Sequence, residues 1–443
     1  MFVDRREELN FLEESFENRP QLIVLYGRRR VGKTELVKKF LEKRDNSVYH
    51  LVSRESTKDQ IEEFKQSLSN QIPYVDDLKD DWSVLLKNTG ELDVLVIDEF
   101  QYLIESDSEI LKVFQKAWDE HLSDENIMII LTGSSVGMME NEVMGYKSPL
   151  YGRRTGQWHL KQFRFENIQS FFPEKDIKEL VQIYAVLGGT PFYLEKFDSQ
   201  KDIQQNIREN ILSQGCVLRE EAESLLKQEL RKPDNYFSVL KAVARGKTSF
   251  NEIQNETGIH KSSLSKYTKR LRDLHILEKE LPVTASEKSR RGRYRIKDNF
   301  FDFWFRFIFP EKSNLQQNTD SVAEKIDEEL PRYTGKKFEQ VCRQHIQKNR
   351  EFNKVGRWWN KEDEIDIAAI DDRENTILTG EVKWTSEKVG KKELEKLKEK
   401  TQKIRWKNDQ RKEEYALFSK NGFSEELKQA DDVSLYKLDD LIS

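Results

Sequence analysis

The chain has 443 residues, of which 36% are hydrophobic and 35% are charged, and its formal net charge is −5. This length exceeds one compact core and predicts roughly two to four domains, whereas the apolar runs have strand length and are too short to span a bilayer. The N-terminus lacks the apolar segment of a signal peptide, and the only cysteines are Cys216 and Cys342. We therefore expect a cytoplasmic protein with no membrane partner, no disulfide framework and no thiolate metal site.

The first predicted strand, Gln21–Tyr26, leads directly into a glycine loop. In the loop GRRRVGKT, four residues separate two glycines, and the residues after it have helical periodicity, as in a phosphate-binding loop. Backbone N–H groups and the helix dipole bind the anion there. Lys33 is expected to reach the β- and γ-phosphates and Thr34 to bind Mg²⁺. The three arginines either are solvated or contact a neighbour or nucleic acid. The loop residues predicted to bind the nucleotide are Gly27, Arg28, Arg29, Arg30, Val31, Gly32, Lys33, Thr34 and Glu35.

Two later apolar runs end in polar residues that suit the same chemistry. Asp98 and Glu99 follow VLVI, and we expect Asp98 to hold Mg²⁺ and Glu99 to polarise the attacking water. Ser134 lies in LTGSS, at the end of the run IMIIL, and is expected to sense the γ-phosphate, with a simple turn as the alternative. Strands that alternate with helical stretches predict an α/β fold whose parallel sheet is covered on both faces.

Arg153 and Arg154 lie together in SPLYGRRTG, on a predicted loop. An arginine at this place can stabilise the charge of a phosphoryl-transfer transition state, either within the chain or from a neighbouring subunit. The second case would make the protein a homo-oligomer. The alternative is a pair of surface arginines with no catalytic role.

Six stretches together, FVDRREEL, YGRRRVGKT, VLVIDEFQYL, LTGSS, SPLYGRRTG and LGGTPFYL, resemble the archaeal-type AAA+ ATPases near their origin-recognition and signal-transducing (STAND) branches. The resemblance covers almost the whole chain. It implies ATP and Mg²⁺ as ligands, an ATPase core at residues 1–162 and a helical lid at 163–232. It also implies that Pro191 touches the adenine, and that Phe2, Val3 and Arg5 approach the base from the other side.

Residues 233–311 are predicted to form a winged helix-turn-helix. Gly258 separates two helical stretches at the required spacing, and Leu264, Tyr267, Leu271 and Leu274 can pack inward. Residues 261–297 hold twelve Lys and Arg against four Asp and Glu, which favours duplex DNA as a partner. The alternative is a docking module that joins two domains. The aromatic run FFDFWFRFIFP is expected to pack rather than to stack on bases. The residues predicted to contact DNA are Ser262, Ser263, Lys266, Lys269, Arg270, Arg290, Arg291 and Arg293.

Residues 312–330 are predicted to be a polar linker, and residues 331–443 a C-terminal α/β domain. Asp366 lies in EIDIAAI, and Glu381 and Lys383 share one face of the next predicted strand. This pattern resembles the PD-(D/E)xK core of restriction endonucleases. The resemblance implies that Asp366 and Glu381 hold Mg²⁺, with Glu339 as a further carboxylate, and that Lys383 stabilises phosphate charge. Ile365 stands where that family often has proline, and Glu364 is a candidate substitute for Asp366. The lysine-rich helix that follows is interpreted as a solvated face.

The predicted function is an ATPase that couples its nucleotide state to DNA binding and to metal-dependent DNA cleavage by the C-terminal domain. Two alternatives stay open: a switch whose C-terminal domain binds but does not cut, and a STAND-like scaffold whose winged helix contacts only protein.

Overall fold

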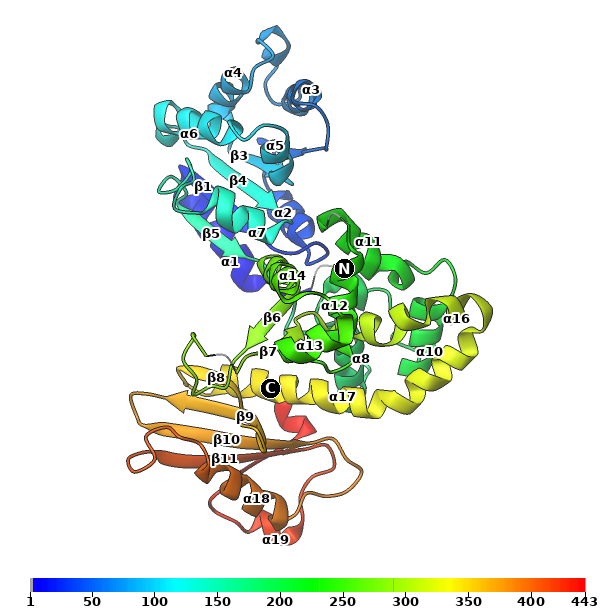
Figure 1. The fold of residues 1–443 in the computed structure, drawn as a ribbon. Coiled ribbons are helices and arrows are strands. Elements are labelled where there is room, and N and C mark those ends of the chain that lie inside the picture. The colour runs from blue at the N-terminus through cyan, green and yellow to red at the C-terminus, as the bar shows by residue number, and fades with distance from the viewer. Residues whose placement is uncertain (1–2, 231, 290, 443) are drawn as a thin grey trace. The chain divides into compact units, whose positions relative to one another are not determined.

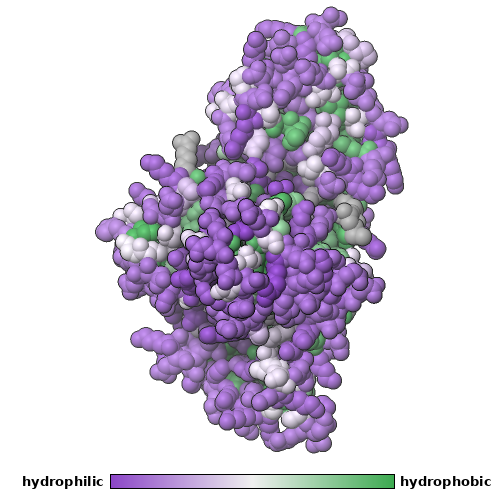
Figure 2. All heavy atoms as spheres, turned by 90° about the vertical axis from the view of Figure 1, so that its right-hand side faces the viewer, coloured by the Kyte–Doolittle hydropathy of each residue, from purple (hydrophilic) through white to green (hydrophobic). Residues whose placement is uncertain are grey.

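The structure is a computed structural model that describes residues 3–230, 232–289 and 291–442. The chain divides into two compact units, Met1–Gln162 and Phe163–Ser443 (Figure 1). The first unit ends at the residue predicted to end the ATPase core, whereas the lid, the helix-turn-helix region and the C-terminal domain belong to one unit. None of the helices within the described ranges combines the length and the apolar character needed to cross a bilayer. The face drawn in Figure 2 is mainly hydrophilic, with hydrophobic residues in small separate areas.

The first unit is built on a five-stranded sheet in the order β2-β3-β4-β1-β5. All neighbouring strands run parallel, as the alternating strand and helix pattern predicts. The apolar side chains of the central strands alternate between the two faces, so that Leu22 and Val24 join one core while Ile23 and Leu25 join the other. The strands are β1 (Gln21–Tyr26), β2 (Ser47–Leu51), β3 (Val94–Asp98), β4 (Met128–Gly133) and β5 (Gly156–His159).

Helices cover both faces of this sheet (Figure 1). On one face α2 packs through Leu36, Val37 and Phe40, which recur at helical spacing, and α1 adds Leu12. The opposite face is covered by the remaining helices of the unit. The helices are α1 (Arg6–Glu17), α2 (Lys33–Leu41), α3 (Thr57–Leu68), α4 (Trp82–Lys87), α5 (Gln101–Ser106), α6 (Ile110–Glu120) and α7 (Val136–Met138).

The second unit starts with the helices of the predicted lid. They share one hydrophobic core with the aromatic segment Asn299–Ile308, in which Phe300, Phe301 and Trp304 are fully buried. The prediction that this aromatic run packs is therefore confirmed. The helices are α8 (Ile177–Leu187), α9 (Pro191–Leu194), α10 (Ile203–Ile207), α11 (Val217–Glu229) and α15 (Asn299–Phe303).

Between α11 and α15, three helices are followed by a two-stranded antiparallel sheet. The predicted inward residues Leu264, Leu271 and Leu274 are buried, and Tyr267 packs against the same core. Gly258 ends the second of these helices in the left-handed conformation, with φ of 67°. The elements are α12 (Asp234–Ala244), α13 (Phe250–Thr257), α14 (Lys261–Asp273), β6 (Leu277–Glu280) and β7 (Arg293–Ile296).

The prediction that residues 312–330 form a linker is wrong. These residues form α16 (Lys312–Gln317) and the first part of α17 (Thr319–Asn349), a helix that continues past Pro331. Val322, Ile326 and Leu330 recur at helical spacing and are buried in the core of the unit. Because all but Ala323 of the residues between them are charged, the composition resembles a linker although the helix is packed.

The C-terminal part is a mixed sheet in the order β12-β11-β10-β9-β8. β8, β9 and β10 are antiparallel, whereas β10, β11 and β12 are parallel, so the predicted hairpin between β9 and β10 is present. The strands and helices are β8 (Lys354–Trp359), β9 (Glu364–Asp371), β10 (Thr376–Lys383), α18 (Lys391–Gln402), β11 (Lys412–Ser419), α19 (Glu425–Lys428) and β12 (Ser434–Lys437).

Candidate functional site

The glycine loop connects the end of β1 to the start of α2. Gly32 has a φ of 93°, which side chains rarely adopt, and it is the N-cap of α2. A Cβ atom at Gly27 would lie 2.2 Å from the carbonyl oxygen of Leu160, so this position also needs glycine. Val31 is buried beneath the loop, Arg28 and Arg29 are half-buried, and Arg30 and Glu35 are exposed. The loop thus has the tight turn and the helix N-terminus that an anion site requires.

The side chain of Lys33 folds back onto this loop. Its side chain is buried, and Nζ donates to the carbonyl oxygens of Gly27 at 2.9 Å and Arg28 at 3.2 Å. The ammonium is therefore held against the backbone of the glycine loop.

Asp98 at the end of β3 is the centre of a hydrogen-bond network. Its Oδ2 accepts from Thr34 Oγ1 at 3.0 Å and from the Tyr49 hydroxyl at 2.5 Å. Its Oδ1 accepts from the backbone N–H of Glu99 at 2.9 Å and from the Thr132 hydroxyl. Hydroxyl and carboxylate oxygens are the hard donors that Mg²⁺ prefers, so Thr34 and Asp98 fit that ion. The fold therefore joins residues that are 64 positions apart in the sequence.

Glu99 lies beside this network in the left-handed conformation, with φ of 57°. Its Oε2 accepts from Ser134 Oγ at 2.5 Å and from the side-chain amide of Gln101. The same amide also donates to Ser134 Oγ at 3.1 Å. Ser134 is buried just after β4. The residue predicted to sense the γ-phosphate therefore hydrogen-bonds directly to Glu99, the predicted catalytic carboxylate. A non-glycine residue with positive φ costs about 1–3 kcal/mol and is typical of functional sites.

The N-terminal residues predicted to approach the base are placed in different ways. Arg5 is buried, and its guanidinium donates to the carbonyl oxygens of Val31 at 3.1 Å and Lys161 at 2.8 Å. Burial lowers the pKa of Arg5, and the paired Glu8 opposes that shift. Arg5 therefore fastens the N-terminal segment to the glycine loop. Val3 is half-buried before α1, and Phe2 lies outside the described residues.

The two predicted catalytic arginines contact other parts of the first unit. Arg153 binds the Asp119 carboxylate of α6 at 3.0 Å, and Arg154 donates to the carbonyl oxygen of Met144 at 2.9 Å. Burial and Glu140 raise the pKa of Tyr26 at the end of β1, and Arg154 opposes this shift. Arg154 is thus the arginine of the pair that lies near the strand leading into the glycine loop.

Pro191 belongs to the second unit, as the first residue of α9. It follows the turn at Gly188-Gly189, where the backbone N–H of Phe163 donates to the carbonyl oxygen of Gly189 at 2.8 Å. Its predicted contact with adenine stays a prediction.

The predicted acidic site of the C-terminal sheet is assembled from three elements. Asp366 on β9 accepts from the backbone N–H of Val382 at 3.0 Å, so it lies beside β10. On β10, Lys383 Nζ lies 2.9 Å from Glu381 Oε1. Burial raises the pKa of Asp366 to about 7, with further contributions from the Glu339 and Glu381 carboxylates. All four predicted residues are therefore in electrostatic contact.

Basic residues missed in the sequence complete this site. Lys400 of α18 lies 3.1 Å from Glu381 Oε2, so this lysine-rich helix is not only a solvated face. Glu339 pairs with Arg343 at 3.7 Å and with Arg357 at 3.5 Å. Across the described residues, no three or more His, Cys, Asp or Glu side chains are grouped so that they could hold a metal ion. A cation here would be held by fewer carboxylates and by water, which Mg²⁺ commonly retains.

The predicted DNA contacts separate into two groups. On α14, Ser262, Lys266, Lys269 and Arg270 are exposed, and Ser263 is half-buried. On the hairpin that follows, Arg291 is exposed and Arg290 lies outside the described residues.

Arg293 has a role that the sequence did not predict. It pairs with Glu364 of β9 at 2.8 Å and lies over the Trp359 ring. The hairpin therefore contacts the C-terminal sheet through Arg293, and the same contact occupies Glu364, the predicted substitute for Asp366.

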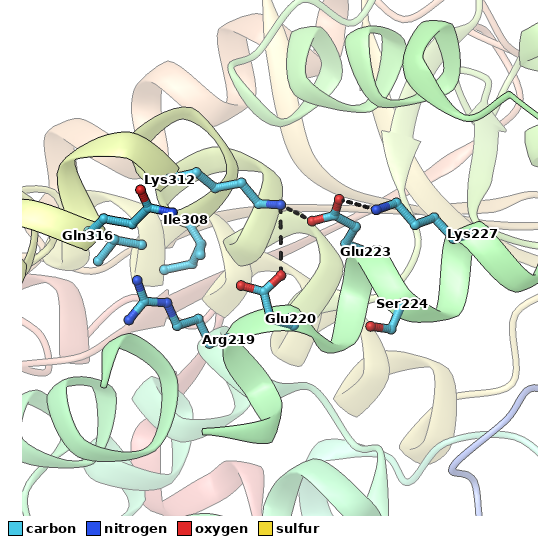
Figure 3. A pocket seen from close by; sticks show the side chains of 9 residues that line it. Arg219, Glu220, Glu223, Ser224, Lys227, Ile308, Lys312 and Gln316 are labelled. Carbon is cyan, nitrogen blue, oxygen red and sulfur yellow. Dashed lines mark ion pairs between the residues drawn. The ribbon is translucent and has the colours of Figure 1, made fainter. Parts of the chain in front are cut away.

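A pocket of about 280 Å³ lies between α11 and α16 of the second unit (Figure 3). Its charges pair with one another: Lys312 with Glu220 at 3.9 Å and with Glu223, and Lys227 with Glu223 at 2.8 Å. The internal pairing explains how these side chains are accommodated and gives no reason to assign a substrate to this pocket.

The parallel sheet, the glycine loop with its lysine, and the acid pair at the end of β3 define the first unit as a P-loop ATPase domain. In agreement, residues 2–197 match a family model described as an ATPase domain predominantly from Archaea, and residues 304–401 match one described as Archaea bacterial proteins of unknown function. The chain is 38% identical over 392 residues to Uncharacterized protein MJECL04 of Methanocaldococcus jannaschii, covering 87% of this chain and 88% of that protein. The chain belongs to this archaeal family of P-loop ATPases.

The first of the two solved structures that follow agrees in fold with this chain. The Walker-type ATPase PABY2304 of Pyrococcus abyssi has a TM-score of 0.53 and 24% identity, covering 69% of this chain and 96% of that one. The ORC2 protein of Aeropyrum pernix has a TM-score of 0.45 and 14% identity, covering 72% and 94%.

Proposed function

We propose that the protein hydrolyses ATP with Mg²⁺ at the glycine loop. The observation that carries this proposal is the hydrogen bond from Thr34 to Asp98, with Glu99 beside it and Lys33 on the loop. Bound Mg²⁺ would neutralise phosphate charge. Thr34 donates its hydrogen to Asp98, which leaves its oxygen lone pairs available to the ion. Lys33 binds phosphate oxygens, and Glu99 orients and polarises the attacking water. Purified protein should hydrolyse ATP only with a divalent cation, and a protein without Mg²⁺-dependent nucleotide affinity contradicts the proposal.

We further propose that the nucleotide state controls binding of duplex DNA through α14. The exposed residues Lys266, Lys269 and Arg270 lie on one helix of a three-helix segment followed by a hairpin, which is the order of a winged helix. ATP and ADP must contact the protein differently for such coupling to occur. A STAND-like scaffold that contacts only protein is the competing function, and DNA affinity distinguishes the two.

Replacing Lys266 and Lys269 together with alanine should weaken binding of a labelled DNA duplex and reduce the slope of log affinity against log salt by about 2, because each lysine neutralises about one phosphate. The measurement is fluorescence anisotropy over a salt series, with ATP or ADP present. The matched control is the double variant Lys112→Ala and Lys116→Ala, which removes two exposed lysines from α6. Equal slopes for all three proteins would reject α14 as the DNA contact, and no DNA affinity of the wild type at low salt would reject the DNA partner.

A second candidate function is metal-dependent DNA cleavage by the C-terminal sheet. It is supported by Asp366, Glu381 and Lys383 lying together beside the β9–β10 hairpin. The competing possibility is an inactive domain that only binds DNA or protein. A cation would be held by Asp366 and Glu381, while Lys383 stays charged because Glu381 and Asp366 outweigh the effect of burial on its pKa.

Single substitutions Asp366→Ala, Glu381→Ala and Lys383→Ala should each abolish cleavage of linear and circular DNA with Mg²⁺ or Mn²⁺, because each removes a ligand or a charge at the reacting phosphate. Burial raises the pKa of Asp366 to about 7, so a proton competes with the cation for this carboxylate as the pH falls through that value. The Mg²⁺ concentration needed for half-maximal cleavage should therefore rise as the pH falls. Asp372→Ala, in the exposed turn after β9, is the matched control. If cleavage survives all three substitutions, another site is responsible for it. If the wild type does not cleave DNA, the C-terminal domain is the inactive, binding-only domain.

A further inference from the structure

Tyr49 extends from β2 toward the site where Thr34 and Asp98 meet. Side chains on β2 alternate between the two faces of the sheet, so Val48 joins one core, while Tyr49 packs against the core that contains α2. β2 runs parallel to β3, with Leu51 opposite Asp98. This register and the length of the tyrosine side chain bring its hydroxyl to 2.5 Å from Asp98 Oδ2.

The hydroxyl acts as a donor to a carboxylate that already has other donors. Oδ2 accepts from Tyr49 and from Thr34, and Oδ1 accepts from the Glu99 N–H and from Thr132. These four contacts come from β2, α2, the β3 end and β4, and together they fix the plane of the carboxylate. The Tyr49 hydroxyl donates this hydrogen bond, because the carboxylate oxygen of Asp98 can only accept.

We propose that Tyr49 is a positioning residue for the divalent cation of the ATPase site: it acts through Asp98, by holding that carboxylate in the orientation the ion requires. This inference depends on the proposed ATPase function. Groups that hold a metal ligand from behind, without touching the metal, typically contribute about 10- to 100-fold to metal affinity or activity. Thr34, Glu99 and Thr132 belong to stretches that the sequence motifs identify, whereas Tyr49 lies on β2, which no motif identifies.

The test is Tyr49→Phe, which removes one hydroxyl and keeps the ring that packs on α2. Binding of AMP-PNP, a non-hydrolysable ATP analogue, is measured by calorimetry over a series of Mg²⁺ concentrations and in EDTA. The Mg²⁺ concentration for half-maximal stimulation of binding should rise about 10-fold or more, whereas affinity in EDTA should not change. Tyr74→Phe is the matched control, because the Tyr74 hydroxyl bonds to Glu91 at 3.2 Å on the exposed surface.

The possible results separate the inference from the function on which it depends. A shift in Mg²⁺ dependence for Tyr49→Phe alone supports the inference. Equal Mg²⁺ dependence for wild type and Tyr49→Phe overturns it while the ATPase function stands. If Tyr49→Phe also loses affinity for AMP-PNP in EDTA, the inference is overturned, because the hydroxyl would then support the fold or the loop rather than the cation. Wild-type protein that does not bind AMP-PNP, or binds it independently of Mg²⁺, overturns both.

Discussion

Replacing Glu99 with glutamine should leave ATP bound and lower kcat by about 10²- to 10⁴-fold. Glutamine has nearly the same shape as glutamate, but its neutral amide cannot take up a proton from the attacking water. In the structure the carboxylate accepts from Ser134 and Gln101, so the site keeps it in place from two sides. Steady-state phosphate release gives kcat, and calorimetry with ATP gives the affinity.

The control for this substitution is Glu105→Gln, an exposed glutamate on α5 that pairs with Arg54 at 3.3 Å. It makes the same chemical change away from the nucleotide and should retain the wild-type kcat. A Glu99→Gln protein with wild-type turnover would show that another group activates the water.

Replacing Lys33 with alanine should weaken ATP binding by about 30-fold or more, since loss of one partner of a buried, hydrogen-bonded charge pair costs about 2–5 kcal/mol. The lysine is buried on the loop, and its ammonium is held within 3.2 Å of two loop carbonyl oxygens, so its charge is concentrated where the phosphates bind. The measurement is the dissociation constant for ATP with saturating Mg²⁺.

Lys38→Ala is the matched control, because Lys38 is exposed on the same helix. Thermal unfolding without nucleotide shows whether Lys33→Ala keeps its fold despite the loss of its two loop contacts. A folded Lys33→Ala protein with wild-type affinity for ATP would show that the glycine loop does not bind the nucleotide.

Much of the first unit follows from local patterns. The strands that end at Tyr26, Asp98 and Gly133 were predicted because continuous apolar runs bounded by polar residues identify strands buried on both faces. The glycine loop was predicted because its spacing depends on backbone geometry within a few residues. The strands β2 and β5 were not predicted, since SVYHL and GQWH lack a continuous apolar run.

One prediction failed where polar residues conceal a packed helix, and local patterns also missed charge partners that are distant in the sequence. Residues 312–330 look like a linker in composition, but every third or fourth residue of the segment from Val322 to Leu330 enters the core. Arg293 is predicted to contact DNA because it lies in a basic stretch, and that contact stays a prediction. No local pattern in the sequence indicates that Glu364, 71 residues later, pairs with it. Two residues of the nucleotide site were missed. Gln101 could have been suspected because it stands two residues after Glu99, whereas no local pattern points to Tyr49.

The sequence by itself determined the class of nucleotide site, because a phosphate-binding loop is made by consecutive residues whose conformations are set by glycine and by the start of one helix. Only the tertiary structure decided which side chains support that site and the acidic site of the C-terminal sheet. Strand order and register bring Tyr49, Thr132 and Thr34 onto Asp98, and packing of a hairpin against a sheet brings Arg293 onto Glu364. Such contacts depend on the distances between elements that are remote in the chain, and no local pattern of residues specifies those distances.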